Sequence, residues 1–431
     1  MYKLRFLLTI TLLFTLSGCA GQSVGEDTIR VWHWMSDRED AFVELAQNYE
    51  AETGIKVKFD LYAPSESYTQ KIKAAAQTST LPDVFGVLGE SRDLAAFVKA
   101  DFVADLSEAM GQKNTGSWRD RFFEKAVSVN TFKPNNEFDA APGVYGVPLD
   151  VSTIQWVYNK DLFRQAGLDP ENPPKTWIEF TDAAKVLQQN NIPVLVGGFG
   201  EIWMLDALSS NWAMNLMGED KVFDTYRGNV SYLDPDWIRV LQLFKQMADD
   251  NVLVSGAVTM VNKSSEQTFA NGRAAFAFNG SWCVNVYKGM NPALDYAAIL
   301  PPRLSLDHPM KVWGGAGSSF MVHANSPRKE QAIEFLRWLT DKDQQATLAN
   351  ATNNLPANKQ SLEKISPILS QFADDIDNTT HPNVYPVHEY HQVSEAWCKG
   401  IQSILIGEKT PAEVATEVQA VKEREIAREN S

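Results

Sequence analysis

Cysteine is scarce in this sequence, which has three cysteines and six histidines among 431 residues. The cysteines stand far apart, at Cys19, Cys283 and Cys398, so the paired spacing of a zinc site is missing. After residue 18 the chain also lacks any run of about 18 to 20 apolar residues, which excludes a membrane-spanning helix there. Basic residues are outnumbered, with 39 Lys and Arg against 54 Asp and Glu. The net charge of −15 argues against nucleic acid and polyanionic ligands, although one local basic pocket could override it.

Hydrophobic residues make up 44% of the chain, which is enough for real cores. At roughly 150 residues per domain, the length predicts two or three lobes. The twelve tryptophans are a high count for this length. Tryptophan combines a large flat apolar face with one N–H donor, so it suits both core packing and stacking on sugar rings. Most of the twelve are expected in the core, and position must identify the others.

The N-terminus has the pattern of an export signal. Lys3 and Arg5 precede an apolar stretch over 6–16, which is too short for a membrane span. Small residues then lead to Cys19, and this arrangement resembles a bacterial lipobox. It implies a signal peptide at 1–18, a lipid on Cys19 and a polar tether at 19–27, hence an extracytoplasmic protein anchored to a membrane. An ordinary secretory signal and a cytosolic protein with an apolar start are the alternatives.

Two pairs of residues leave their interpretation open. Cys283 and Cys398 could form a disulfide in an oxidising compartment, or remain two buried thiols. His388 and His391 are three residues apart, but without an evident third ligand a surface helix pair is favoured over a metal site. We expect no cofactor and no metal.

Hydrophobic periodicity predicts an α/β protein. Its opening follows a βαβαβ pattern, which implies a parallel sheet with right-handed crossovers. The later chain continues to alternate, and Thr176 with Glu179 forms a capping box before a helix. The predicted strands are 28–32, 55–61, 81–85, 151–158, 192–196 and 274–278, and the predicted helices are 37–53, 68–77, 161–166, 177–190, 232–249, 329–340 and 412–428.

Five blocks, in order and at suitable spacing, make the chain similar to the family 1 extracellular solute-binding proteins of carbohydrate ABC importers. They cover nearly all of 28–425, and each alone is weak. The blocks are 30–34 with 53–57; 70–72 with 81–85; 145–148 with 157–163 and 174–177; 269–276 with 279–282; and 314–317 with 326–332 and 335–336.

The resemblance implies two α/β lobes joined by crossing strands, as in maltose-binding-protein-like receptors, with the ligand held in the cleft. The chain would cross more than once, so that both lobes are discontinuous. The implied boundaries are lobe 1 at 28–142, lobe 2 at 143–302, a return to lobe 1 at 303–339, and lobe 2 with the C-terminal helices at 340–425.

Ligand contacts are expected on loops at the carboxyl ends of strands, where polar groups fix sugar hydroxyls and aromatic faces cover the ring. By resemblance Glu201 would accept from hydroxyls, Trp203 and Trp282 would stack, and Gly315 would let backbone N–H groups approach. Asp37 could instead cap a helix, and Trp397 could be plain core. The full candidate set is Trp34, Ser36, Asp37, Glu90, Asp150, Ser152, Glu201, Trp203, Asn279, Trp282, Trp313, Gly315 and Trp397.

The sequence therefore predicts a monomeric, non-catalytic receptor that binds a carbohydrate and docks on an ABC permease. Two alternatives stay open. A receptor for a polyamine, peptide or phosphodiester would use the acidic candidates differently. A lipid-anchored glycoside hydrolase would need two carboxylates about 5 to 10 Å apart, which Glu90, Asp150 and Glu201 could supply.

Overall fold

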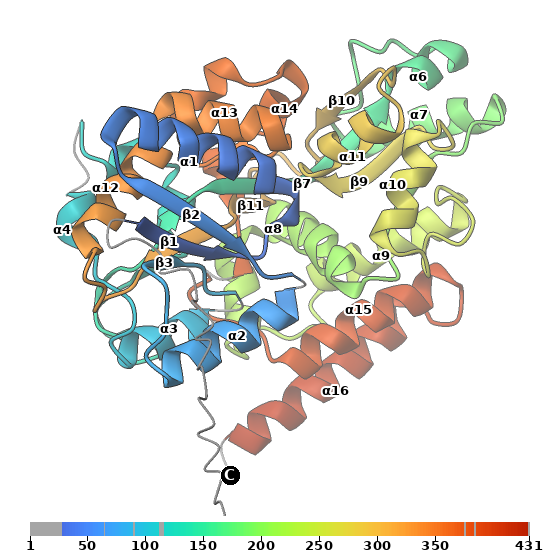
Figure 1. Ribbon diagram of the computed structural model, residues 1–431. Coiled ribbons are helices and arrows are strands. Elements are labelled where there is room, and N and C mark those ends of the chain that lie inside the picture. Colours follow the sequence, from blue (N-terminus) through green and yellow to red (C-terminus); the bar gives the residue numbers. More distant parts are fainter. Residues whose placement is uncertain are drawn as a thin grey trace, which may run out of the picture.

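The computed structural model describes residues 28–63, 65–88, 91–111, 116–374, 376–382 and 385–429. The expected lipidation site Cys19 and the candidate Glu90 lie outside these residues. Two mixed sheets, each covered by helices, form the two halves of the molecule (Figure 1). In the described part of the chain every helix is too short or too polar to cross a lipid bilayer.

The first sheet has the strand order β2-β1-β3-β12-β6. Its strands are β1 (Thr28–His33), β2 (Lys56–Leu61), β3 (Val84–Phe85), β12 (Ser319–Val322) and β6 (Val147–Pro148). The predicted βαβαβ opening is confirmed, because β1 pairs in parallel with both β2 and β3 through α1 (Glu39–Thr53) and α2 (Ser65–Gln77). β12, from far along the chain, joins antiparallel to β3 and β6.

Helix α1 shows why this local sequence folds as predicted. Its apolar residues recur every three or four positions, so that Phe42, Leu45 and Tyr49 are buried on one face. Gly54 then ends the helix in the left-handed region, at φ 75°, where a glycine has no steric penalty.

The second sheet is built around β7 (Asp150–Asn159), a ten-residue strand of which nine residues are buried. It pairs antiparallel with β9 (Phe276–Gly280), β10 (Tyr296–Ile299), β11 (Val312–Ala316) and β13 (Leu355–Pro356). β8 (Leu195–Gly197) runs parallel to β9, and β14 (Thr379–Thr380) parallel to β11.

Helices surround the second sheet. α6 (Lys160–Ala166), α7 (Trp177–Gln189), α10 (Asn262–Ala270) and α11 (Cys283–Met290) lie near β9 and β10, and the Thr176–Glu179 capping box is present on α7. Another group contains α8 (Ile202–Tyr226), α9 (Pro235–Asp249), α15 (His391–Leu405) and α16 (Pro411–Glu429), with α15 packed on the other three. Trp212, Trp237 and Trp397 are core residues here, as expected for most of the tryptophans.

The two halves meet where the chain passes from one sheet to the other. β6 ends two residues before β7 begins, and β11 ends three residues before β12 begins. The two passages lie side by side, because Leu149 donates its N–H to the Ser318 carbonyl at 2.8 Å. Strand pairing places β6 in the first sheet and β11 in the second. Strand pairing assigns each strand to a sheet but does not define the boundaries of the lobes, which therefore stay a prediction.

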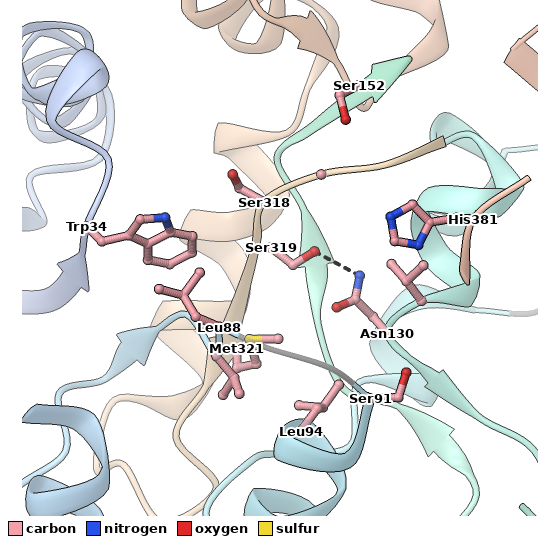
Figure 2. Close-up of a pocket in the computed structure, with 13 residues that line it drawn as sticks. Trp34, Leu88, Ser91, Leu94, Asn130, Ser152, Ser318, Ser319, Met321 and His381 are labelled. Atoms are coloured by element: carbon pink, nitrogen blue, oxygen red, sulfur yellow. Dashed lines mark hydrogen bonds between the residues drawn. The ribbon is translucent and has the colours of Figure 1, made fainter. Parts of the chain in front are cut away.

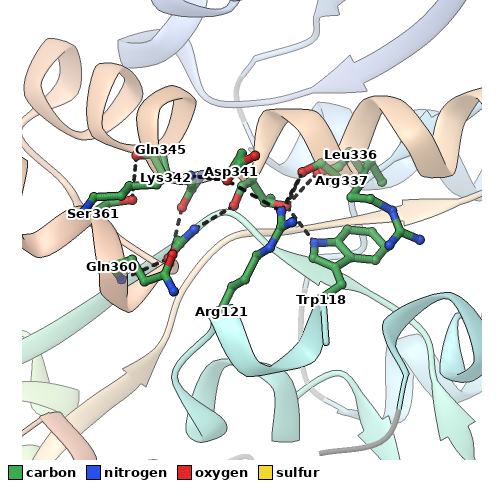
Figure 3. Close-up of polar contacts among 11 residues, drawn as sticks. Trp118, Arg121, Leu336, Arg337, Asp341, Lys342, Gln345, Gln360 and Ser361 are labelled. Atoms are coloured by element: carbon green, nitrogen blue, oxygen red, sulfur yellow. Dashed lines mark hydrogen bonds and ion pairs between the residues drawn. The ribbon is translucent and has the colours of Figure 1, made fainter. Parts of the chain in front are cut away.

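A third passage runs from α12 (Lys329–Leu339) to α13 (Lys342–Thr352) and is held by polar contacts (Figure 3). The Trp118 indole donates to Thr340 Oγ1 at 3.0 Å, and Arg121 pairs with Asp341 at 3.7 Å. Asn358 donates to the Thr340 carbonyl at 3.0 Å. The Thr340 carbonyl at the end of α12 thereby accepts from a distant side chain, while Asp341 caps α13 by accepting from the Lys342 N–H at 2.8 Å.

The two cysteines that sequence left undecided are free buried thiols, one in each of the two largest hydrophobic cores. His391 begins α15, whereas His388 lies just before it, so the expected helix pair is only half helical. The described residues contain no group of three His, Cys, Asp or Glu side chains that could hold a metal ion.

Candidate ligand site

A cavity of about 290 Å³ lies where the two passages between the sheets meet the first sheet (Figure 2). Trp34 follows β1, Val87 and Leu88 follow β3, and Ser152 lies near the start of β7, so strand ends supply much of the wall. The described residues that line it are Trp34, Val87, Leu88, Ser91, Leu94, Val129, Asn130, Ser152, Gly317, Ser318, Ser319, Met321 and His381.

One side of the cavity is polar. Figure 2 shows Ser318, Ser152 and His381 on the same side, with Ser319 and Asn130 joined by a hydrogen bond. Asn130 donates to Ser319 Oγ at 2.8 Å and to the Ala126 carbonyl at 2.9 Å, which fixes its amide. Burial lowers the pKa of His381 to about 4, so its ring is neutral at neutral pH. This side therefore offers neutral hydrogen-bonding groups.

The opposite side is largely aliphatic, with Trp34 at its edge and Ser91 beside Leu94. Leu88, Leu94 and Met321 group below Trp34 in Figure 2. The Trp34 ring is held against Tyr68, with ring centroids 5.1 Å apart, and over Gly86, where any Cβ would lie 2.2 Å from Trp34 Cζ3. A glycine is required there because no side chain fits beneath the indole.

A second aromatic surface lies at the ends of β8 and β9, outside the lining of the cavity. Trp203 and Trp282 have ring centroids 6.2 Å apart at 54°, and Trp203 keeps 37% of its surface exposed. Trp282 lies over Gly280, where a Cβ would lie 2.0 Å from its ring. Trp203 is exposed and Trp282 is half-buried, so both rings keep surface with which a sugar could stack.

Each of these tryptophans donates its indole N–H to a glutamate. Trp203 donates to Glu201 Oε2 at 3.0 Å, and Trp282 donates to Glu266 Oε1 at 3.1 Å. Asn262 links the two acids, since its backbone N–H donates to Glu201 at 2.7 Å and its amide to Glu266 at 3.1 Å. Burial raises the pKa of Glu266, which is only 5% exposed.

Asp150 is buried, and the expected need for a partner is met within the protein. It pairs with the Arg38 guanidinium, and both side chains are 9% exposed. It also accepts from the Ser318 backbone N–H at 2.6 Å. The pair therefore ties the last residue of η1 (Ser36–Arg38) to both passages between the sheets, next to the cavity residues Gly317 and Ser318.

The remaining candidates are placed as follows. Asp37 accepts from Asn354 at 3.2 Å and, with exposed Ser36, does not line the cavity. Trp313 donates to Ser210 at 2.9 Å, and its ring lies 6.3 Å from the cavity residue His381. Asn279 is buried and donates to Glu266 at 3.2 Å.

Two candidates are packed too tightly to face a ligand in this structure. Gly315 has φ 79°, and a Cβ there would lie 2.4 Å from Lys125 Cβ. Trp397 is 4% exposed, donates to Ser209 at 2.9 Å, and packs edge-on against Trp237 at 5.1 Å. Trp397 is therefore a core residue, which is the second of the two roles considered for it from sequence.

Several residues of the site were not identified from sequence, among them Arg38, Asn130, Glu266, Ser318 and His381. Glu266 lies three residues before the block at 269–276. An acid among the buried positions of a helix needs a partner, so this residue could have been identified as a candidate from sequence. Asn130 and His381 had no local signal, because contacts between distant segments bring them to the cavity.

Three comparisons place the chain among known proteins. A family model described as bacterial extracellular solute-binding protein matches residues 44–380. A Brucella abortus binding protein is 24% identical over 95% of each chain. The diacetylchitobiose binding protein DasA of Streptomyces coelicolor is 26% identical over 82% of this chain and 80% of its own.

Solved structures share the fold. The cyclic alpha-maltosyl-1,6-maltose binding protein of Arthrobacter globiformis is similar with a TM-score of 0.69 and 22% identity. The match covers 91% of this chain and 97% of that one. The two-lobed architecture implied by the sequence blocks is therefore confirmed.

Proposed function

The chain belongs to the bacterial extracellular solute-binding protein family, and from this premise we propose that it captures a neutral sugar or oligosaccharide for an ABC importer. The cavity between the sheets carries the proposal. None of the described residues that line it is charged at neutral pH, and they offer serine hydroxyls, an amide and the Trp34 ring. Hydroxyls and amides bond sugar hydroxyls, while an indole face covers ring C–H groups.

The relatives support a sugar. DasA is named for binding diacetylchitobiose, and the Arthrobacter protein for a cyclic maltosyl-maltose. Trp203 and Trp282 offer a second stacking surface, so we propose that a longer sugar extends from the cavity towards this pair. The ligand contacts we propose are Trp34, Ser152, Ser318, Trp203 and Trp282.

Capture would work by shifting an equilibrium between open and closed arrangements of the lobes. A ligand that contacts both sides favours the closed form, which then docks on a permease. We propose that a lipid on Cys19 keeps the monomeric receptor near the permease, which raises its effective concentration there. Replacing Cys19 with serine should abolish incorporation of labelled palmitate in the expressing bacterium, whereas unchanged incorporation would contradict the anchor.

Binding without hydrolysis is favoured by the engagement of Asp150 and Glu201, the two candidate acids within the described residues. A glycoside hydrolase needs one carboxyl to protonate the leaving group and another to attack or activate water. The two Glu201 oxygens accept from Asn262 and Trp203, and Asp150 is paired with Arg38. These contacts orient the site without leaving those acids placed for proton transfer.

A calorimetric screen of the purified mature protein tests the proposal. The panel contains neutral mono- and oligosaccharides together with spermidine and sn-glycerol 3-phosphate. We expect saturable binding of at least one neutral sugar and none of the charged solutes. Binding of only a charged solute, or of no sugar, would refute the proposal.

A further inference from the structure

The two most exposed large apolar side chains of the described chain line one groove. Ile178 is 73% exposed and Leu306 is 81% exposed, while the other exposed large apolar side chains among the described residues reach at most 54%. The groove lies between the start of α7, one face of α9 and the segment 303–306, and it shares no described residue with the sugar cavity. Its volume is about 420 Å³. Single exposed apolar residues are ordinary, but two of them along one groove mark an interaction surface.

The same groove carries positive charge. Arg239 on α9 and Arg303 belong to its lining, and no Asp or Glu is among the described residues that line it. Both arginines are exposed, and neither side chain has an ion pair or a hydrogen bond with a described residue. The chain as a whole carries a net charge of −15. Attraction of an acidic partner to this groove is therefore local and is not a property of the whole surface.

The groove is held in shape by contacts between its parts. Arg303 donates its backbone N–H to the Lys175 carbonyl at 3.0 Å and accepts from the Trp177 N–H at 3.0 Å. The Trp177 indole donates to Gln246 Oε1 at 2.9 Å, which joins α7 to α9. A partner that enters a groove already formed has little ordering of this chain to oppose its binding.

We propose that this groove docks an acidic extracytoplasmic loop of the ABC permease. The inference rests on the proposed function, because it names a docking surface for that receptor. One apolar side chain of the loop lies between Ile178 and Leu306, and its carboxylates pair with Arg239 and Arg303, whose guanidinium groups suit carboxylates. Membrane proteins carry few Lys and Arg in their extracytoplasmic loops, so such a loop lacks the charges that the arginines repel. A concave groove admits a chain segment, whereas a lipid surface is flat.

Photo-crosslinking of the full-length protein in its native bacterium tests the proposal. A benzoylphenylalanine takes the place of Leu306, and the captured molecule is identified by mass spectrometry. We expect capture of a membrane subunit of the ABC permease. Capture only of lipid, only of a second copy of this chain, or of nothing would overturn the docking groove.

Charge reversal shows whether the arginines are responsible. Arg239→Glu/Arg303→Glu should reduce the permease cross-link at least ten-fold, because both anchors then repel the loop. The matched control, Arg273→Glu/Lys288→Glu, reverses two exposed basic residues outside the groove and should leave the cross-link within about two-fold. All four side chains are exposed, so both variants are expected to fold, which thermal unfolding checks. Equal losses in the two variants, or no loss in the first, would overturn the assignment to this groove.

The outcomes separate the two proposals. Sugar binding by the purified protein without a permease cross-link overturns the docking groove and leaves the sugar receptor standing. A permease cross-link that the groove variant abolishes, in a protein that binds no sugar of the panel, supports the groove and overturns the proposed ligand.

Discussion

The cavity and the tryptophan pair hold their aromatic rings by different means. Trp34 is held by shape, because it fills the space above Gly86 and lies against Tyr68. Trp282 also lies over a glycine, Gly280, but Trp203 and Trp282 are held in addition by hydrogen bonds, because each indole donates to a glutamate. The described lining of the cavity is neutral, whereas the pair is bordered by two acids.

The difference suggests separate roles in ligand binding for the cavity and for the tryptophan pair. A shaped cavity whose described lining is neutral discriminates by fit, and its ligand affinity should be insensitive to salt. Rings oriented by carboxylates can stack on any sugar that reaches them, so the pair adds affinity with less discrimination. The predictions below test this division, beginning with the largest expected effect.

Arg38→Ala should have the largest effect, because it removes the frame of the cavity. The substitution leaves Asp150 as an uncompensated buried charge, which costs about 3–5 kcal/mol of unfolding free energy. Denaturant unfolding measures this loss. The Arg38→Ala/Asp150→Ala double variant should recover part of it, and a single variant within about 0.5 kcal/mol of wild type would show that the pair does not frame the cavity.

Trp34→Ala and Trp282→Ala compare the two regions directly. Loss of Trp34 should weaken sugar binding by about 2 kcal/mol, or roughly thirty-fold, because a buried aromatic contact dominates a small site. Loss of Trp282 should cost less for a disaccharide and more for a longer sugar. Calorimetry with sugars of increasing length measures both, and equal losses at every length would show that the division is wrong.

Sequence was sufficient for elements whose signal is local. The βαβαβ opening, the Gly54 helix end and the Thr176 capping box were predicted because periodicity and capping act within a few residues. The motif blocks led to Trp34 and Trp282, which follow β1 and β9 within two residues, and resemblance outside the blocks added Ser152, near the start of β7, and Trp203, in the first turn of α8.

Contacts between distant segments could not be predicted in the same way. The Arg38 partner of Asp150 lies 112 positions earlier in the numbering, and His381 reaches the cavity through the pairing of β14 with β11. Trp397 and Trp282 were both candidates from sequence, yet Trp397 is buried whereas Trp282 is only half-buried. The burial of Trp397 results from the helices packed around it and not from its local sequence.

Glu266→Gln against Glu266→Ala tests whether a carboxylate orients the pair. Gln keeps an oxygen acceptor for the Trp282 and Asn279 donors, so it should bind sugar almost as wild type. Ala removes the acceptor and should weaken binding by about 1 kcal/mol, roughly five-fold, while shifting tryptophan emission. If Ala and Gln behave alike in affinity and emission, Glu266 does not position Trp282.

The smallest effect concerns pH and the buried His381. Its folded pKa of about 4 lies below the ordinary value of 6.5, so the unfolded chain binds more protons between these values. Stability from this group is therefore present above pH 6.5 and is lost as the pH falls towards 4, by roughly 0.7 kcal/mol between pH 7 and 6.

Two comparisons isolate this contribution from the other titrating groups. Asp206 acts in the opposite direction, since burial raises its pKa to about 6 and acid then stabilises the fold. His381→Asn should flatten the stability curve in this range, and His388→Asn, at an exposed position, should not. An unchanged slope in His381→Asn would show that the ring is not buried in the neutral form.

One titration tests the central claim, that a cavity whose described lining is neutral binds a neutral sugar. Tryptophan emission of the wild-type protein and of Trp34→Ala is followed with the best-binding sugar of the panel, at two salt concentrations about ten-fold apart. The account predicts a saturable change in wild type, a Kd that does not depend on salt, and roughly thirty-fold weaker binding in the variant. A Kd that rises with salt, or a variant that binds as well as wild type, would contradict it.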